Sequence, residues 1–373
     1  MKLLVSCIST RHSVLKEHWV EAGSRLYSGQ ATKTECPLTV LGSYEKPKED
    51  LGGAVSLIED KGIPPPCGRD KSGYLPSRQG ALSGGQVSYL KTVELKMAAG
   101  MVTSERGVFV TSFGSVHEVD ADLGNIRQNV VSSPLFNALH SISRTQRGYL
   151  VASTGIDLLL EFNRDGEILW SWWATDHGFE LTPAGRPRVL DKLADHRTIK
   201  YGTLSQTTHV NSAAELPDGR ILASLFHQGT VIVIDRETGA WQVVLEGLDH
   251  PHAVRVLDEG IPPPCGREGI DTRSASYPTI NRGSTGPYFT VADTVHGKAL
   301  LVRINKNGGH VEEEIDAGTN WLQDCHYDGT HDCWILVDGK NSRLSLRRGR
   351  SGERTFAQFD FDPEWRLYEA HIL

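Results

Sequence analysis

Histidine recurs in this chain at the start of similar stretches of sequence, and imidazole is the side chain that most readily transfers protons or binds a transition metal near neutral pH. In most copies a strand-like run, a turn and a second β-rich run follow. The histidines in this setting are His140, His209, His252, His326 and His371. If the stretches are copies of one unit, the histidines take one structural position in each copy. Copies arranged around an axis would bring the imidazoles together.

The repeated unit is a β-strand pattern with turns at D-G, T-G or N-G. Clear copies run over residues 140–173, 209–246, 252–315 and 326–361, and an earlier copy without a histidine contains GVFVTS and SVHEVD. Short alternating runs separated by turn residues are typical of antiparallel strands. A period of about 40 to 50 residues is typical of propeller blades. The sequence therefore predicts an all-β fold, a six-bladed β-propeller.

The sixth blade is predicted to be a closing blade built from both termini. Tyr368–Leu373 (YEAHIL) resembles an inner strand, and Lys2–Ser6 (KLLVS) resembles the second strand that should follow it. Joining the two ends of the chain in one blade removes free sheet edges. We expect a single domain over residues 1–373.

Three long loop insertions interrupt the repeats, at residues 11–85, 174–207 and 258–287, with some helix expected around VLDKLADH in the second. The octapeptide GIPPPCGR occurs twice, at Gly62–Arg69 and Gly260–Arg267. It is either a duplicated rigid polyproline-like turn or a pair of loops that bring Cys67 and Cys265 together. The six cysteines show no C-x-x-C spacing, so neither a zinc ribbon nor a disulfide scaffold is indicated.

The composition excludes some classes of partner. A net charge of −7 argues against nucleic acid, which needs a basic surface. No apolar stretch approaches the roughly 20 residues that cross a bilayer, so no membrane partner is expected. The N-terminal MKLLVSCIST lacks a full signal-peptide core. We expect a cytoplasmic protein that acts on a small-molecule substrate.

Four imidazoles without thiolates favour a divalent transition metal over magnesium or calcium, which prefer oxygen ligands. The predicted ligands are His140, His209, His252 and His326, with His371 as a fifth ligand or a proton-transfer base. Fe(II) is the first choice, with Mn and Zn next. The alternative is that the histidines cap strands and hydrogen-bond neighbouring blades.

Three neighbours of the histidines are also candidate site residues. His250, in His-Pro-His, lies one strand period before His252 and could replace or support it. Asn211 could orient a ligand or substrate. Asp324 could hold a ligating ring by its other nitrogen or transfer a proton.

Residues 139–258, with a weaker match around His326, resemble the blades of the arylsulfotransferase-like propeller family. The similarity lies in THVNSAAELPDGRILASLFHQGTVIVIDRETGAWQVVLEG and HSISRTQRGYLVASTGIDLLLEFNRDGEILWSWW, where a histidine opens a blade that ends in a tryptophan strand or a similar run. The resemblance implies a propeller in which a histidine accepts a sulfuryl group, and His140, His209, His252 and His326 are the matching positions. No sulfate-binding arginine of the family is matched to a channel position. A histidine-lined channel is also similar in architecture to the iron site of carotenoid-cleaving oxygenases and to manganese-dependent propeller pectate lyases.

These observations predict a metal-dependent enzyme of lyase or oxygenase type, with the metal held by histidines in the propeller channel. One alternative is a metal-free, arylsulfotransferase-like group transferase with a histidine nucleophile. Another is a non-catalytic propeller that binds a protein.

Overall fold

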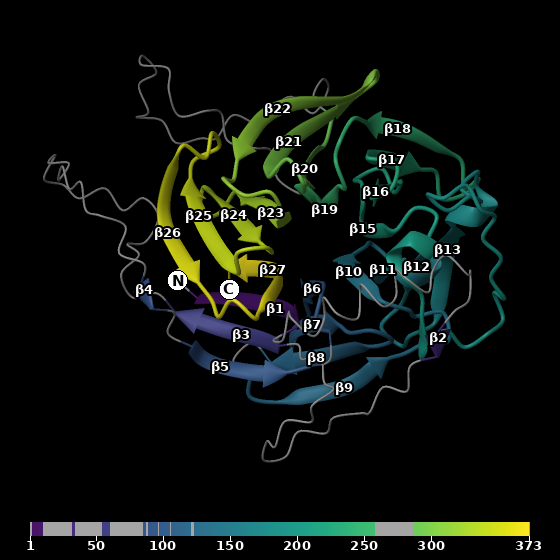
Figure 1. Ribbon diagram of the computed structural model, residues 1–373, viewed down its shortest axis with the longest axis horizontal. Coiled ribbons are helices and arrows are strands. Elements are labelled where there is room, and N and C mark those ends of the chain that lie inside the picture. The colour runs from purple at the N-terminus through teal and green to yellow at the C-terminus, as the bar shows by residue number, and fades with distance from the viewer. Residues whose placement is uncertain are drawn as a thin grey trace, which may run out of the picture.

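The computed structural model describes residues 2–9, 32–33, 54–59, 85–86, 89–95, 97–104, 106–120, 123–257 and 286–372. These residues form β-sheets arranged around a central axis, so the predicted β-propeller class is confirmed (Figure 1). None of the described helices is long and apolar enough to cross a membrane.

Five of the sheets are each built from strands that follow one another along the chain. The first contains β6 (Met101–Thr103), β7 (Gly107–Thr111), β8 (Val116–Asp120) and β9 (Ile126–Val131). The second contains β10 (Leu139–Arg144), β11 (Tyr149–Ser153), β12 (Leu158–Phe162) and β13 (Ile168–Trp173). The third contains β15 (Val210–Glu215), β16 (Ile221–Leu225), β17 (Thr230–Ile234) and β18 (Trp241–Leu245).

The other two continuous sheets complete this part of the ring. One contains β19 (His252–Leu257), β20 (Tyr288–Asp293), β21 (Lys298–Asn305) and β22 (Gly308–Asp316). The other contains β23 (Leu322–Asp328), β24 (Cys333–Asp338), β25 (Arg343–Arg348) and β26 (Arg354–Asp360), and the short β4 (Gly85–Gln86) pairs parallel to β26.

A further sheet joins the two ends of the chain, as predicted. Its strands, in order, are β27 (Arg366–Ile372), β1 (Lys2–Ser9), β3 (Ala54–Glu59) and β5 (Tyr89–Glu94). The β27 strand pairs antiparallel with β1, so the last strand of the chain is the inner strand of this sheet. The β3 strand belongs to this sheet although it lies within the 11–85 region that was expected to be an insertion.

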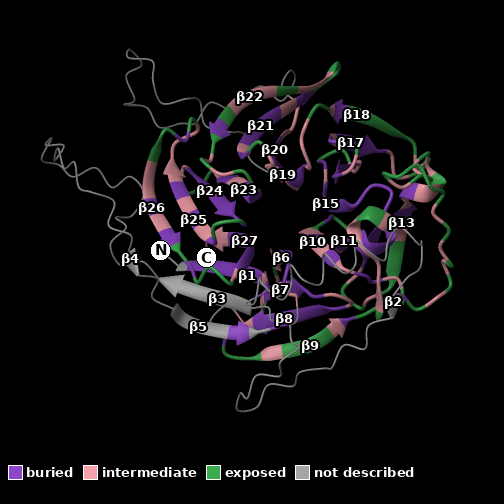
Figure 2. Cartoon of the chain, in the orientation of Figure 1, coloured by how far each residue is buried: buried purple, intermediate pink, exposed green. Residues whose placement is uncertain are grey.

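The core lies between neighbouring sheets, where apolar side chains of the second and third strands interlock. Every residue of β11 and β12 is buried, whereas the outer strand β13 is largely exposed (Figure 2). Trp172 and Trp334 are among the largest fully buried side chains. Burying a large apolar side chain contributes about 1.5–3 kcal/mol, so this packing holds each inner strand rigidly beside the axis.

Residues 174–207 form an excursion between β13 and β15. It contains the 3-10 turns η2 (Ala174–Asp176) and η3 (Thr203–Ser205) and the short β14 (Ile199–Lys200), which pairs with β2 (Thr32–Lys33). A third 3-10 turn, η1 (Thr154–Ile156), lies between β11 and β12.

The helix expected around VLDKLADH in this excursion is wrong, because the segment forms turns. Asp191 accepts backbone hydrogen bonds from Leu193 and Ala194, and such local bonds compete with a helix. Val189 and Leu193 are 91% and 95% exposed, so the apolar residues that suggested a helix have no core to pack on.

Several sequence-based predictions fall outside the described residues. Both copies of GIPPPCGR, and with them the pairing of Cys67 with Cys265, lie there, as does residue range 258–285 of the third insertion.

Candidate functional site

The inner strands β6, β10, β15, β19, β23 and β27 lie nearest the axis and position the candidate residues (Figure 1). Five of these strands carry one extra residue at a shift in their pairing with the next strand. The skipped residues are His140 in β10, Asn211 in β15, Gln323 in β23 and Tyr368 in β27, and the shift in β19 falls between His252 and Arg255. A β-bulge of this kind leaves one residue out of the ladder and redirects its side chain.

The bulges show that the histidines do not share one structural position, so that expectation is wrong. His140 aligns with Asn211 and Gln323, whereas His209 precedes the bulge of its strand and His326 follows it. The sequence comparison aligned the repeats on their histidines. In the structure, the pairing of main-chain atoms sets the register of each strand, and it does not align these histidines.

One group of rings gathers around Phe226. The ring centroid of Phe226 lies 4.6 Å from that of His209, 4.2 Å from His250 and 5.3 Å from His252. The His140 and His209 centroids are 5.0 Å apart. Phe226 and these imidazole rings therefore pack against one another, most of them in edge contacts.

Three of these histidines are held in a neutral form. Burial lowers the pKa of His140 to about 4 and that of His252 to about 3, and it lowers the pKa of His209 well below the ordinary value. Nδ1 of His140 bonds to the carbonyl oxygen of Ala138 at 2.7 Å. Nδ1 of His209 contacts Oε1 of Gln206. Because a carbonyl oxygen only accepts, Nδ1 carries the proton in both rings and Nε2 keeps its lone pair.

Asp157 fixes the segment that carries His209. Its Oδ1 accepts hydrogen bonds from the backbone N–H groups of Thr208 and His209, and its Oδ2 accepts one from Thr207. Oδ2 also receives Nη1 of Arg188 at 2.7 Å, and both side chains are buried. The 174–207 excursion, through Arg188, therefore takes part in placing the histidine.

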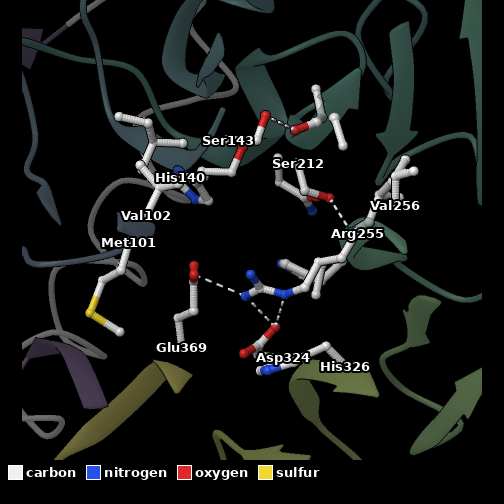
Figure 3. Close-up of a pocket in the computed structure, with 18 of the residues that line it drawn as sticks. Met101, Val102, His140, Ser143, Ser212, Arg255, Val256, Asp324, His326 and Glu369 are labelled. Carbon is white, nitrogen blue, oxygen red and sulfur yellow. Dashed lines mark hydrogen bonds and ion pairs between the residues drawn. The ribbon is translucent and has the colours of Figure 1, made fainter. Parts of the chain in front are cut away.

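A second group of residues forms an ionic network on three inner strands. Arg255 of β19 donates from Nε and Nη2 to Oδ1 of Asp324 on β23, at 3.3 and 2.9 Å. Its Nη2 also lies 2.9 Å from Oε1 of Glu369 on β27. Figure 3 shows the guanidinium between the two carboxylates. Nε2 of His371 lies 2.5 Å from the same Oε1 of Glu369.

Burial and charge push the pKa values in this network in opposite directions. Burial and the nearby Glu369 raise the pKa of Asp324, and Arg255 only partly offsets this. Burial would also raise the pKa of Glu369, but Arg255 and His371 outweigh it and lower that pKa. For Arg255, the two carboxylates outweigh burial and raise its pKa. Two carboxyl groups whose pKa values are driven apart are suited to act as acid and base.

The network faces a cavity of about 480 Å³ in the channel. The inner strands supply its lining, which includes His140, Asn211, His252, Arg255, Asp324, His326, Tyr368, Glu369 and His371. This volume lies in the range of small-molecule sites.

The cavity brings together many of the predicted site residues but not all of them. His140, His252, His326, His371, Asp324 and Asn211 line it, whereas His209 and His250 belong to the ring group around Phe226. The side chain of Asn211 is already engaged, because its Nδ2 donates to the carbonyl of Pro251 and its Oδ1 accepts from Ser224.

Asp324 does not hold a histidine ring, so that predicted role is wrong. Its oxygens instead receive Arg255 and the backbone N–H of Ala370. The ring it was expected to orient, His326, has a buried Nδ1 without a hydrogen-bond partner among the described residues. A guanidinium is the stronger partner, because it offers several donors in a fixed plane.

The sequence interpretation missed Arg255, Glu369 and Tyr368. Arg255 stands in the otherwise apolar run HAVRVL, and Glu369 stands in YEAHIL. Charged residues within short apolar strands were the signal available, since a buried charge requires a partner. Arg255 also lines the channel cavity, where the sequence had offered no match to a sulfate-binding arginine of the arylsulfotransferase-like family.

The histidine side chains have the right chemistry for a transition metal, but in the described part of the chain their placement does not form a metal site. Neutral imidazoles with Nδ1 held by oxygen acceptors are typical of metal ligands. Yet among the described residues no group of three or more His, Cys, Asp and Glu side chains is placed to hold a metal ion. The four-histidine site therefore stays a prediction.

Comparison with known proteins identifies no family. No family model and no curated protein matches the chain. Among solved structures, virginiamycin B lyase from Staphylococcus aureus aligns at 11% identity and a TM-score of 0.41, over 70% of this chain and 69% of that one. The Pseudomonas aeruginosa periplasmic gluconolactonase aligns at 12% and 0.43, over 87% and 81%. A chain of the nidogen/laminin complex aligns at 11% and 0.49, over 79% and 92%.

Those identities are too low to carry an activity to this chain. The resemblance of residues 139–258 to arylsulfotransferase-like propellers is confirmed only as far as the propeller fold, and the family itself stays a prediction.

Proposed function

We propose that this chain is an enzyme that binds a small organic molecule in the channel cavity and transfers protons on it, in an elimination of the lyase type. The observation that carries the proposal is the network of Arg255, Asp324, Glu369 and His371, which joins three inner strands and faces the cavity. Buried carboxyl groups with perturbed pKa values in a cavity are typical of catalytic sites.

His371 is the proposed base. The lowered pKa of Glu369 keeps its carboxylate ionised, so Oε1 can only accept a hydrogen bond from Nε2 of His371. The ring then carries its proton on Nε2 and leaves Nδ1 to accept one. A carboxylate in this position fixes the tautomer of the imidazole and stabilises the imidazolium that forms during the reaction.

Asp324 is the proposed acid, because its raised pKa favours the protonated carboxyl group. In the reaction, His371 takes a proton from a carbon atom of the substrate. The electron pair of that C–H bond forms a double bond as the neighbouring bond to the leaving group breaks. The leaving group departs with the electrons of its bond and receives the proton of Asp324, which balances protons and charge.

The experiment compares the wild-type protein with the variants His371→Asn and Asp324→Asn in a mixture of cellular small molecules followed by mass spectrometry. We expect at least one compound to be consumed by the wild type and by neither variant. The matched control is His331→Asn, which removes a histidine that hydrogen-bonds Asp328 away from the cavity lining. Equal consumption by wild type and both channel variants would refute the proposal.

A second candidate is that a divalent metal takes part, with His140 and His209 as ligands. It is favoured by the 5.0 Å separation of their rings and by the hydrogen bonds that leave Nε2 of each ring unprotonated. Bound there, Fe(II), Mn or Zn would act as a Lewis acid on the substrate.

Elemental analysis of protein purified without chelator tests this second candidate. A stoichiometric metal that is lost in His140→Ala and His209→Ala, but kept in His331→Ala, would support it. A metal content equal in all four proteins would rule out these ligands.

A further inference from the structure

The cavity begins at the same level on five of the inner strands. On β10, β15, β19, β23 and β27 its first lining residue lies at the shift in pairing with the next strand, and no described residue before it on these strands lines the cavity. The lining continues toward the opposite end of the strands, as far as Arg144 on β10 and Glu215 on β15. The cavity therefore has a floor, which is made by His140, Asn211, His252, Gln323 and Tyr368.

The floor side chains are held in place by residues beside the cavity. Nδ1 of His252 lies 3.0 Å from the carbonyl oxygen of His250 and 2.9 Å from Oγ1 of Thr294. Oε1 of Gln323 accepts a hydrogen bond from Nε1 of Trp321 at 2.9 Å. A ligand that binds to groups already fixed in this way does not have to order them first, which favours binding.

Four polar atoms of the floor remain for a ligand. Because Nδ1 of His140 and Nδ1 of His252 each contact a carbonyl oxygen, the proton of each neutral ring lies on Nδ1 and its Nε2 accepts hydrogen bonds. Nε2 of Gln323 donates hydrogen bonds, and the hydroxyl group of Tyr368 both donates and accepts them. None of these four atoms has a hydrogen-bond partner among the described residues, and none is enclosed by protein.

The charged groups of the cavity do not belong to its floor. Nη2 of Arg255 lies 2.9 Å from Oε1 of Glu369, and Asp324 is the proposed acid that carries a proton. These groups therefore comprise one cation and one anion, paired with each other. Arg144 and Glu215 line only the opposite end of the cavity. The floor is polar and uncharged, so it is suited to a neutral polar group.

The donors and acceptors of the floor select hydroxyl groups. An ammonium group has only donors and would leave the amide N–H groups of Gln323 without an acceptor. A carboxylate has only acceptors and would leave both imidazole nitrogens without a donor. A hydroxyl group does both, but it donates only one hydrogen bond. Two hydroxyl groups are therefore needed to satisfy the two imidazole rings.

The spacing of the floor atoms favours hydroxyl groups over a primary amide, which also donates and accepts. The four atoms come from four different strands around the axis, β10, β19, β23 and β27. Hydroxyl groups on separate carbon atoms reach such atoms better than the closely bonded nitrogen and oxygen of one amide. Met101 and Val102 lie across the cavity from Arg255 and offer an apolar wall for the carbon skeleton (Figure 3).

We infer that the channel cavity binds a neutral polyol. At least two of its hydroxyl groups rest on the floor, and its carbon skeleton lies against Met101 and Val102. This inference names the class of substrate, and it rests on the proposed function only in sharing its pocket and the protonated Asp324.

The test uses four probes built on one ring: trans-cyclohexane-1,2-diol, cyclohexanol, cyclohexanecarboxamide and cyclohexylamine. Binding to the wild-type protein is measured at pH 7 by NMR titration. We expect the diol to bind at least about fivefold more tightly than cyclohexanol, because it makes additional hydrogen bonds, and more tightly than the amide and the amine. Equal binding of diol and cyclohexanol, tighter binding of the amide or the amine, or no binding of the diol would overturn the proposal.

Two variants locate the bound diol. Tyr368→Phe removes only the hydroxyl group, and Gln323→Met removes the amide group from a side chain of similar length. Each should lose most of the preference for the diol over cyclohexanol. The matched control is Tyr149→Phe, which changes a buried tyrosine of β11 outside the cavity lining and should keep the preference.

A preference that survives in both floor variants, or that is lost equally in Tyr149→Phe, would overturn the assignment of the diol to the floor. Binding requires no turnover. Absence of the preference would therefore leave the His371 consumption test unaffected, and absence of consumption would leave the binding result unaffected.

Discussion

Replacing Arg255 by methionine removes the cation that contacts both Asp324 and Glu369 while keeping an unbranched side chain of similar length. The ionised Glu369 would then be buried without its guanidinium partner, and Asp324 would lose the same donor. Breaking a buried ion pair by removing one partner typically costs about 3–5 kcal/mol. Arg255 keeps 22% of its side-chain exposure, so water relieves part of the cost. We expect a loss of about 3 kcal/mol in the free energy of unfolding at pH 7.

The loss should shrink as pH falls. In the wild type, Arg255 and His371 lower the pKa of Glu369, so this group stabilises the fold above its unfolded pKa and ceases to do so as pH falls through the folded value. In Arg255→Met, burial raises the folded pKa of both carboxyl groups above the unfolded values. Protonation then favours the folded state, and the variant regains stability as pH falls from 7 toward 5.

Urea unfolding followed by tryptophan fluorescence at pH 7 and pH 5 measures both effects. The control is Arg343→Met, which breaks an exposed pair with Asp360 and should cost less than about 1 kcal/mol at either pH. If Arg255→Met loses no more than this control at pH 7, or loses the same amount at both pH values, the buried charge network described above is wrong.

Three further predictions follow from other contacts. Asp157→Ala removes the acceptor of three backbone N–H groups and leaves the buried Arg188 without its carboxylate partner. The free energy of unfolding, measured by urea titration, should fall by about 3–5 kcal/mol. A loss below about 1 kcal/mol would contradict the role given to Asp157. Gly155→Ala places a Cβ atom 1.6 Å from Oδ1 of Asn137, so its melting temperature should drop sharply, and an unchanged value would refute this close packing. Burial lowers the pKa of His140 to about 4 and that of His252 to about 3, so these rings gain protons on unfolding. The free energy of unfolding should therefore fall as pH drops from about 6.5 toward 4. Replacing both histidines by glutamine should flatten this pH dependence in thermal melts, and an unaltered dependence would contradict neutral rings.

The propeller could be predicted from the sequence because its signals are local. Alternating strands and glycine turns recur along the chain, and YEAHIL at one end matches KLLVS at the other. Each blade satisfies most of its hydrogen bonds within itself, so the class of fold follows once the repeat is found.

The site could be predicted only in part, because it depends on register and on contacts between strands. A bulge moves His140 into line with Asn211 rather than with His209, and nothing in the local pattern shows which residue is left out of the ladder. Arg255 and Glu369 are far apart in sequence, on β19 and β27, and meet only because the inner strands converge on the axis. The histidines could be identified from their recurrence in the sequence, whereas the charged residues beside them could be identified only from the structure.

Proton transfer in the channel is tested most directly by isotope labelling. A compound that the wild-type protein consumes is supplied with deuterium at its carbon atoms, and the products are measured by mass spectrometry. Removal of a carbon-bound proton by His371 predicts that the products together keep one carbon-bound deuterium fewer than the compound with the wild type, and that His371→Asn does not form these products. Products that keep every carbon-bound deuterium, or equal product formation by the variant, would contradict the account.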